Sequence, residues 1–369
     1  MPIPVSKPYL PNREKLNKYI DQIYESGWLT NNGPLVRQLT KKLEEKFSVD
    51  NILLVANGTL ALQIAYRTLL DTQNIETTSE ALTTPFTFIA TSNSLMWEGL
   101  TPVFADINKT DWCINPDNIA ANITKNTKLI VPVHVFGNSC EIEKIDKIAT
   151  EYGIKTVYDA SHSFGIQYKD KNILQYGDAS VISLHATKLF HTVEGALLRF
   201  KRKSDFEKAK QLINFGFNQD KEPKSLGINA KMNEVEAAFG LAAIDDINEI
   251  IAERQHIADI YEEHLSSNPH IEQINRSSNQ AYLPVLFRSG TAASEVLKKL
   301  QEKEIEAKRY FFPSLDTLEH LNSLSTCETS QDIANRILCL PIYTGLSKDK
   351  IQTICNCINE IDLSHQQCI

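Results

Sequence analysis

The stretch ILLVANGTLAL at residues 52–62 decides the fold class. Its leading apolar residues, Ile52–Val55, predict a short buried strand. The apolar spacing from Leu60 to Leu70 predicts an amphipathic helix. Asn57-Gly58-Thr59 joins the two, so the chain passes from strand to helix through a glycine turn. Strand, short turn and helix form the repeating unit of an α/β protein.

The same unit recurs along the chain. Further strands are predicted at residues 81–84, 102–106, 129–135, 156–159 and 179–184, and helices at 35–47, 88–98 and 141–152. Residues 195–200 are expected to pair antiparallel with the strand at 179–184. Alternating strands and helices with short connections imply a mainly parallel sheet that helices cover on both faces.

The two ends of the chain differ from this pattern. The first 30 residues are polar and rich in turn formers. A long helix is expected from Glu234 to Leu265, followed by strands at 282–287 and 337–340 and helices at 292–302 and 348–362. Because 369 residues exceed the size at which one core keeps growing, two domains are expected. These are a large domain at 1–240 and a smaller α+β domain at 241–369.

Composition narrows the possible functions. The formal charge of −8, with no basic cluster longer than residues 201–203, argues against a nucleic-acid binder. No apolar run is long enough for a membrane span, and residues 1–7 lack the apolar core of a signal peptide, so a cytoplasmic protein is expected. The seven cysteines are scattered, and Cys355 and Cys357 would not share a helix face. We therefore expect free thiols and no metal site.

Three features fall where the carboxyl ends of parallel strands should meet, which is the usual location of a site in such folds. First, Gly58 and Thr59 begin a helix whose unpaired amides and positive dipole suit a phosphate. The simpler interpretation is an ordinary helix start. Second, Asp159 ends a strand, where its carboxylate can keep a ring nitrogen protonated or can cap a following helix.

Lys188 is the third feature. It follows the strand that ends near Ser183 and precedes the apolar Leu189 and Phe190. Partial burial would lower its pKa and provide a nucleophilic amine for an aldehyde. A lysine after a strand is more often a surface residue. Considered alone, Lys188 can therefore be either a reactive amine or an ordinary surface lysine.

Order and spacing connect the three features, because the chain resembles the DegT/DnrJ/StrS family of sugar aminotransferases nearly from end to end. Matching segments lie at residues 27–31 (GWLTN), 57–62 (NGTLAL), 85–91 (PFTFIAT), 101–106 (TPVFAD), 132–137 (PVHVFG), 159–162 (DASH), 183–188 (SLHATK) and 227–234 (GINAKMNE). The resemblance implies the cofactor pyridoxal 5′-phosphate (PLP) and the aspartate-aminotransferase fold, known as fold type I.

The resemblance also implies residue roles. Lys188 would be the Schiff-base lysine, and Asp159 would pair with the pyridine nitrogen. Phe88 would stack on the cofactor ring, and His162 would lie near the ring hydroxyl. The remaining residues would bind the cofactor phosphate; they are Gly58, Thr59, Ser183 and, across the interface of a homodimer, Asn229.

Some positions depart from the family pattern without touching a proposed catalytic role. Tyr158, Leu184 and Ala196 stand where the family commonly has Glu, Phe and Gly. Lys188 is retained, whereas related dehydratases have His there, so a dehydratase is disfavoured. Phe311 is a candidate for the substrate cleft, although aromatic residues belong mostly to the core.

Residues 158–165 and 185–195 look like those of transaminases that act on dTDP-linked keto sugars. The resemblance implies transfer of an amino group from L-glutamate to dTDP-4-keto-6-deoxy-D-glucose. The product would be dTDP-4-amino-4,6-dideoxy-D-glucose (the viosamine type), for O-antigen or other surface polysaccharides. The alternatives are a 3-aminotransferase on a dTDP-3-keto-6-deoxyhexose and a UDP-keto-sugar enzyme. A more remote one is a non-catalytic PLP-fold regulator, which usually carries an added DNA-binding domain.

Overall fold

The structure is a computed structural model that describes residues 2–323 and 325–361. The predicted end of the last helix at Asp362 and the cysteine at Cys368 lie outside the described residues.

The described residues form a central sheet of seven strands in the order β1-β9-β8-β5-β4-β2-β3. The strands are Ile52–Val55 (β1), Glu80–Thr83 (β2), Thr101–Phe104 (β3), Thr127–Val131 (β4), Lys155–Asp159 (β5), Ala179–Ser183 (β8) and Ala196–Phe200 (β9). Within this sheet β9 runs antiparallel to its neighbours and the other pairs are parallel. The predicted sheet, including the antiparallel pairing of β8 with β9, is confirmed.

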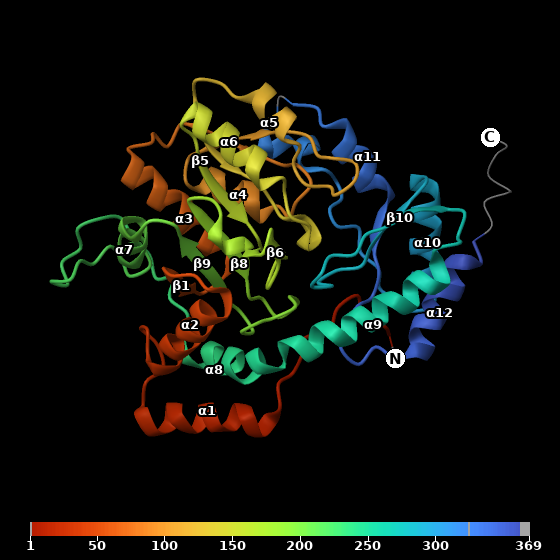
Figure 1. Ribbon diagram of the computed structural model, residues 1–369, viewed down its shortest axis with the longest axis horizontal. Coiled ribbons are helices and arrows are strands. Elements are labelled where there is room, and N and C mark those ends of the chain that lie inside the picture. Colours follow the sequence, from red (N-terminus) through yellow and green to blue (C-terminus); the bar gives the residue numbers. More distant parts are fainter. Residues whose placement is uncertain (1, 324, 362–369) are drawn as a thin grey trace.

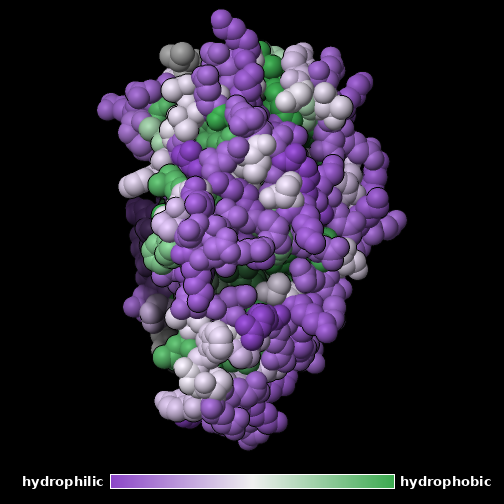
Figure 2. Space-filling model, turned by 90° about the vertical axis from the view of Figure 1, so that its left-hand side faces the viewer, coloured by the Kyte–Doolittle hydropathy of each residue, from purple (hydrophilic) through white to green (hydrophobic). Residues whose placement is uncertain are grey.

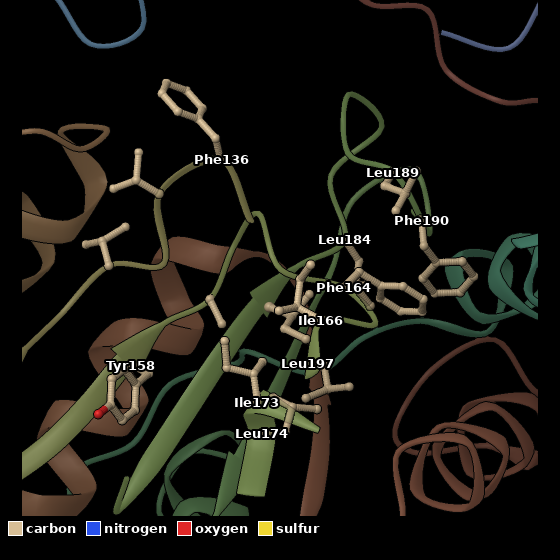
Figure 3. Packing of buried hydrophobic residues seen from close by; sticks show 14 of the residues in the cluster. Phe136, Tyr158, Phe164, Ile166, Ile173, Leu174, Leu184, Leu189, Phe190 and Leu197 are labelled. Atoms are coloured by element: carbon tan, nitrogen blue, oxygen red, sulfur yellow. The ribbon is translucent and has the colours of Figure 1, made fainter. Parts of the chain in front are cut away.

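Helices cover both faces of the sheet (Figure 1). One face packs against α3 (Gly58–Gln73), α4 (Ala90–Trp97) and α7 (Lys203–Leu212). The other packs against α2 (Pro34–Phe47), α5 (Pro116–Asn122), α6 (Ile142–Tyr152) and α8 (Glu234–Ala243). Figure 3 shows part of this second core, where the rings of Phe164 and Phe190 stack with their centres 4.5 Å apart.

A smaller antiparallel sheet follows, formed by β10 (Ile271–Ile274), β11 (Pro284–Phe287) and β12 (Ile337–Cys339). Its core is shared with α9 (Ile247–Leu265), α10 (Gly290–Glu302) and α12 (Lys348–Asn359), and α11 (Glu328–Arg336) lies against α10. A short hairpin joins β6 (Gln167–Tyr168) and β7 (Lys171–Asn172). The α+β character of this part is confirmed, and the boundary at residue 240 stays a prediction.

The N-terminal residues cross to this smaller sheet. The backbone of Ile3 donates to the Glu304 carbonyl at 2.9 Å and accepts from the Glu306 amide at 2.8 Å. The carbonyl of Val5 accepts from the Ile342 amide at 3.2 Å. Ile3 is buried in the core of the smaller sheet. Residues from the two ends of the sequence therefore complete one core.

Several helices differ from the prediction. The polar N-terminal region contains α1 (Arg13–Ser26), which was not predicted from the sequence; its apolar face packs against the core through Leu16, Tyr19, Ile20 and the buried Ile23. The helix expected from 234 to 265 is two helices, α8 and α9, separated by a 3₁₀ turn at 244–246. The helix expected from Phe88 begins at Ala90 instead, which leaves Phe88 in the preceding turn.

A buried carboxylate fixes the start of α2. Glu234, at the first turn of α8, is 1% exposed. Its carboxylate accepts from the backbone amides of Leu35 at 2.7 Å and Val36 at 3.0 Å. A Cβ at Gly33 would lie 2.5 Å from the Glu234 carboxyl carbon, so only glycine permits this approach. The carboxylate takes the place of a helix N-cap, because Gly33 has no side chain to supply one.

Replacing this carboxylate should weaken the fold. We expect Glu234→Gln to lower the free energy of unfolding by about 1–3 kcal/mol, because an amide group would face backbone donors in a buried site. Urea denaturation monitored by circular dichroism measures the change. Glu45→Gln, at an exposed position of α2, is the control and should change stability by less than about 0.5 kcal/mol. Equal stability of the two variants would contradict the capping role.

Candidate active site

Predicted site residues gather at the carboxyl ends of β1, β5 and β8. Gly58 begins the helix after β1, Asp159 is the last residue of β5, and Ser183 is the last residue of β8. The chain then turns from Ser183 to Lys188 before it returns along β9. Parallel strands bring their carboxyl ends to one edge of a sheet, as the sequence predicts for this site.

The N-terminus of α3 and Ser183 form a small cradle. The side chain of Asn57 caps the helix by accepting from the Leu60 amide at 2.9 Å. A Cβ added to Gly58 would lie 3.5 Å from the Cβ of Ser183, an ordinary contact distance, so the start of the helix lies directly beside the end of the strand. Thr59 is exposed in the same helical turn. Free helix amides and two hydroxyls suit a phosphate group.

The Asp159 carboxylate is buried and oriented by hydrogen bonds. It accepts from the hydroxyl of Thr91 at 2.8 Å, from the hydroxyl of Ser161 at 2.6 Å and from the Ser161 amide at 3.1 Å. Residues 160–166 form turns, so no helix begins here and the alternative of a helix N-cap is wrong. A fixed, buried carboxylate can instead bind a protonated ring nitrogen.

Lys188 is half-buried beside Asp159. Its Nζ donates a hydrogen bond to the hydroxyl of Tyr282 at 2.9 Å. Burial lowers the pKa of Lys188 to about 8, although the negative charge of Asp159 acts in the opposite direction. An amine with such a pKa is partly neutral at physiological pH and therefore nucleophilic, unlike an ordinary surface lysine.

His162 is buried on the other side of Lys188. Its Nδ1 accepts from the Phe136 amide at 3.1 Å, so the neutral ring carries its hydrogen on Nε2. Burial, and then the positive charge of Lys188, hold the pKa of His162 well below 6.5. The ring lies parallel to the rings of Phe136 and Phe311, with centres 6.0 and 5.9 Å away. His162 is thus a neutral hydrogen-bond donor inside an aromatic cluster.

Phe88 and Asn229 are placed differently from the buried residues. Phe88 is 59% exposed in the turn after β2, where its ring is available to a bound molecule. Asn229 is exposed in the segment after α7, and its backbone pairs with Asn214. Among the interactions of the described residues, none joins the Asn229 side chain to Lys188 or Asp159 in one chain.

The structure adds residues that the sequence did not assign. Thr91 lies within the segment that resembles the family, but its bond to Asp159 depends on how α4 packs. Tyr282 is 94 positions from Lys188 and precedes β11 of the smaller sheet. No local motif marks Tyr282, and only the packing of the two sheets brings it to Lys188.

Other features of the described residues lie outside this site. A cavity of about 740 Å³ is lined by α2, β1, α7 and the following segment, and none of the predicted cofactor residues borders it. In residues 2–323 and 325–361, no group of three or more His, Cys, Asp or Glu residues could hold a metal ion. In the same residues, no helix is long and apolar enough to cross a membrane.

Comparison with known proteins places this geometry in a family. The DegT/DnrJ/EryC1/StrS aminotransferase family matches residues 11–359. The chain belongs to this family. Its cofactor is PLP, and the cradle at Gly58, the Asp159 carboxylate and the Lys188 amine suit the phosphate, the ring nitrogen and the aldehyde of that molecule.

Relatives and solved structures agree over nearly the whole chain. A dTDP-4-amino-4,6-dideoxy-D-glucose transaminase of Shigella dysenteriae is 37% identical, covering 98% of this chain and 99% of the relative. An enzyme of the same name from Escherichia coli is 34% identical, covering 95% of this chain and 96% of the relative. The structure of DesI in the presence of its TDP-sugar product is 30% identical, with a TM-score of 0.91, covering 97% of this chain and 92% of DesI.

The lowered pKa of Lys188 predicts its reactivity. In the cofactor-free protein, acylation of Lys188 by an amine-selective reagent should reach half its maximal rate near pH 8. Mass spectrometry of the Lys188 peptide measures the rate. The Glu143 carboxylate raises the pKa of Lys169 above its usual 10.5, so that residue is the internal control and should react only at higher pH. If the acylation rates of Lys188 and Lys169 had the same pH midpoint, burial would not lower the pKa of Lys188.

Proposed function

We propose that this protein is a transaminase that moves the amino group of L-glutamate to dTDP-4-keto-6-deoxy-D-glucose. The product is dTDP-4-amino-4,6-dideoxy-D-glucose. The observation that carries the proposal is Lys188, an amine with a lowered pKa that lies beside a buried carboxylate and a neutral histidine. The substrate is supported by the two relatives named for this product, at 37% and 34% identity.

The catalytic roles follow from the environment of each side chain. PLP, when bound, supplies an electron sink. Asp159 holds the ring nitrogen protonated, because Thr91 and Ser161 orient its carboxylate. Lys188 would hold the cofactor through Nζ, and its free amine would carry a proton to and from the reacting carbon. Its lowered pKa lets the amine release and accept that proton near neutral pH.

The other residues hold the cofactor in place. Gly58, Thr59 and Ser183 bind its phosphate at the start of α3, where the helix amides are free. Phe88 stacks on the ring, since its side chain is exposed at this edge of the sheet. His162 lies near the ring hydroxyl, to which its Nε2–H can donate. Fixed orientation of the ring is the positional part of catalysis.

A homodimer is proposed as the functional unit, with Asn229 acting in the partner's site. The segment after α7 extends from the body of the molecule (Figure 1) and exposes Phe215 (49%), Leu226 (71%) and Ile228 (40%). Figure 2 shows that side of the molecule, where hydrophobic patches interrupt a mostly hydrophilic surface. Such patches mark interaction surfaces, and a second copy of the chain is the partner that places Asn229 near a cofactor.

The proposal includes a destination for the product and a compartment for the protein. The resemblance to viosamine-forming enzymes supports O-antigen or another surface polysaccharide as the destination of the product. A cytoplasmic location is supported by the free cysteines of the described residues, among them Cys113 and Cys140, which are typical of a reducing compartment.

A spectroscopic titration tests the reaction. The visible absorbance band of the PLP-bound protein should disappear on addition of L-glutamate and return on addition of dTDP-4-keto-6-deoxy-D-glucose. Lys188→Ala should lose the band of the covalently bound cofactor and lower kcat by at least about 10²–10⁴-fold. Lys169→Ala, at a surface ion pair with Glu143, is the matched control and should behave as the unaltered protein.

The outcomes separate the candidate substrates. Loss of the band without its return would keep the transaminase and reject this substrate. A return with a 3-keto sugar or a UDP-linked sugar instead would establish one of the alternatives. Persistence of the band in Lys188→Ala would reject Lys188 as the cofactor lysine.

Mixed dimers test the position of Asn229. Asn229→Asp should weaken PLP binding, because a carboxylate would face the phosphate. When Asn229→Asp and Lys188→Ala subunits are mixed equally, about a quarter of the activity should return, because half of the dimers are hybrid and each has one complete site. Enzyme assays on the mixture, after exchange of subunits, measure this value. An inactive mixture would place Asn229 in the site of its own chain.

A further inference from the structure

Arg254 is a buried cation whose bonds are unusual. It lies on α9 and is 4% exposed. Its Nη1 donates to the carbonyls of Gln280 and Ala281, each at 3.2 Å, and its Nε has no partner among the described residues. A buried charge is costly, and carbonyl oxygens compensate it less well than a carboxylate does. We therefore expect Arg254 to hold a particular segment of backbone in one conformation.

The two carbonyls belong to the segment that carries Tyr282. Residues 275–283 have no regular secondary structure, and side chains add to the few backbone hydrogen bonds that hold this segment. Arg254 binds it from the α9 side, as described above. From the opposite side, the amide of Asn279 donates to the carbonyls of His162 at 3.0 Å and Phe164 at 3.2 Å. The segment is therefore fixed between α9 and the turn that follows β5.

Tyr282 is the residue that this segment delivers to the site. Its hydroxyl accepts from Lys188 Nζ at 2.9 Å, and its ring centre lies 4.6 Å from that of His162. Burial raises the pKa of Tyr282 well above 10, even though the positive charge of Arg254 lowers it. The hydroxyl is thus uncharged, and it can accept from an ammonium group or donate to a neutral amine.

We propose that Tyr282 is a positioning residue for the Lys188 amine, and that Arg254 acts through Tyr282 by fixing the backbone before it. The proposal rests on the proposed role of Lys188 in catalysis. Because the tyrosine hydroxyl can bond to both protonation states of the amine, Nζ keeps one direction while it gains and loses a proton. Nζ contacts the hydroxyl of Tyr282 and interacts electrostatically with Asp159 of β5 and with His162 of the following turn.

Tyr282→Phe tests the first half of the proposal. The variant keeps the ring against His162 and removes the hydroxyl. A charged donor loses more than a neutral one when its acceptor is removed, so the pH midpoint of Lys188 acylation in the cofactor-free protein should fall by about one unit. In the PLP-bound enzyme, kcat should fall about 10-fold or more with a smaller change in the KM for L-glutamate. An unchanged midpoint together with an unchanged kcat would overturn the proposal.

Arg254→Lys tests the second half, because lysine keeps the charge but has no Nη1 to donate to the carbonyls of Gln280 and Ala281. It should shift the midpoint and kcat in the same direction as Tyr282→Phe. Arg336→Lys is the matched control: Arg336 of α11 pairs with Asp332 and Glu272, it lies outside the segment that carries Tyr282, and its replacement should leave both readouts unchanged. Thermal unfolding verifies that each variant is folded. If Arg254→Lys is unfolded, Arg254→Gln replaces it.

The double variant decides whether Arg254 acts through Tyr282. Added to Tyr282→Phe, the Arg254 substitution should change the midpoint by less than about 0.3 pH unit and kcat by less than about twofold. A full additional effect would show that the two residues act independently and would overturn the second half. Failure of the proposed function gives a different result, namely a cofactor band that persists in Lys188→Ala. Acylation of Lys188 is measured separately, in cofactor-free protein that retains this lysine, so the two failures can be told apart.

Discussion

The register between β5 and β8 is the constraint on which the site depends. Asp159 lies opposite Val181 in the parallel pair, and two residues later β8 ends at Ser183 and the chain turns toward Lys188. Side chains alternate along a strand, so a shift of one residue would turn Asp159 toward the opposite core. In the observed register it faces α4, where Thr91 binds its carboxylate. The position of the carboxylate proposed to bind the cofactor therefore depends on how these two strands pair.

The electrostatics of the site follow from burial. In water Lys188 would carry a positive charge and His162 would be partly protonated, but burial lowers the pKa of both, and the charge of Lys188 lowers that of His162 further. The Asp159 carboxylate favours the charged lysine. The arrangement therefore separates the groups by role: a carboxylate to bind a cation, a neutral imidazole to donate a hydrogen bond, and an amine that changes its protonation state near neutral pH.

Sequence reasoning identified the parts of this site that lie within local motifs. The positions of Gly58, Asp159 and Lys188 at strand ends made them candidates with two interpretations each, and the resemblance to the family gave them their predicted roles. Contacts between distant segments could not be predicted, because no periodicity records them: Tyr282 reaches Lys188 only when the smaller sheet packs beside the larger one. The helix α1 was missed for a different reason: Leu16, Tyr19, Ile20 and Ile23 do follow a helical spacing, but polar residues dominate the composition of the first 30 residues.

The attachment of the N-terminal residues has a consequence for the order in which the chain folds. Ile3 and Val5 bond to backbone groups of Glu304, Glu306 and Ile342, and a ribosome adds Glu306 301 residues after Val5. Ile3 and Val5 must therefore wait for that part of the chain, while the strands between them can assemble earlier. Until the smaller sheet has been synthesised, the side chain of Ile3 has no core to join.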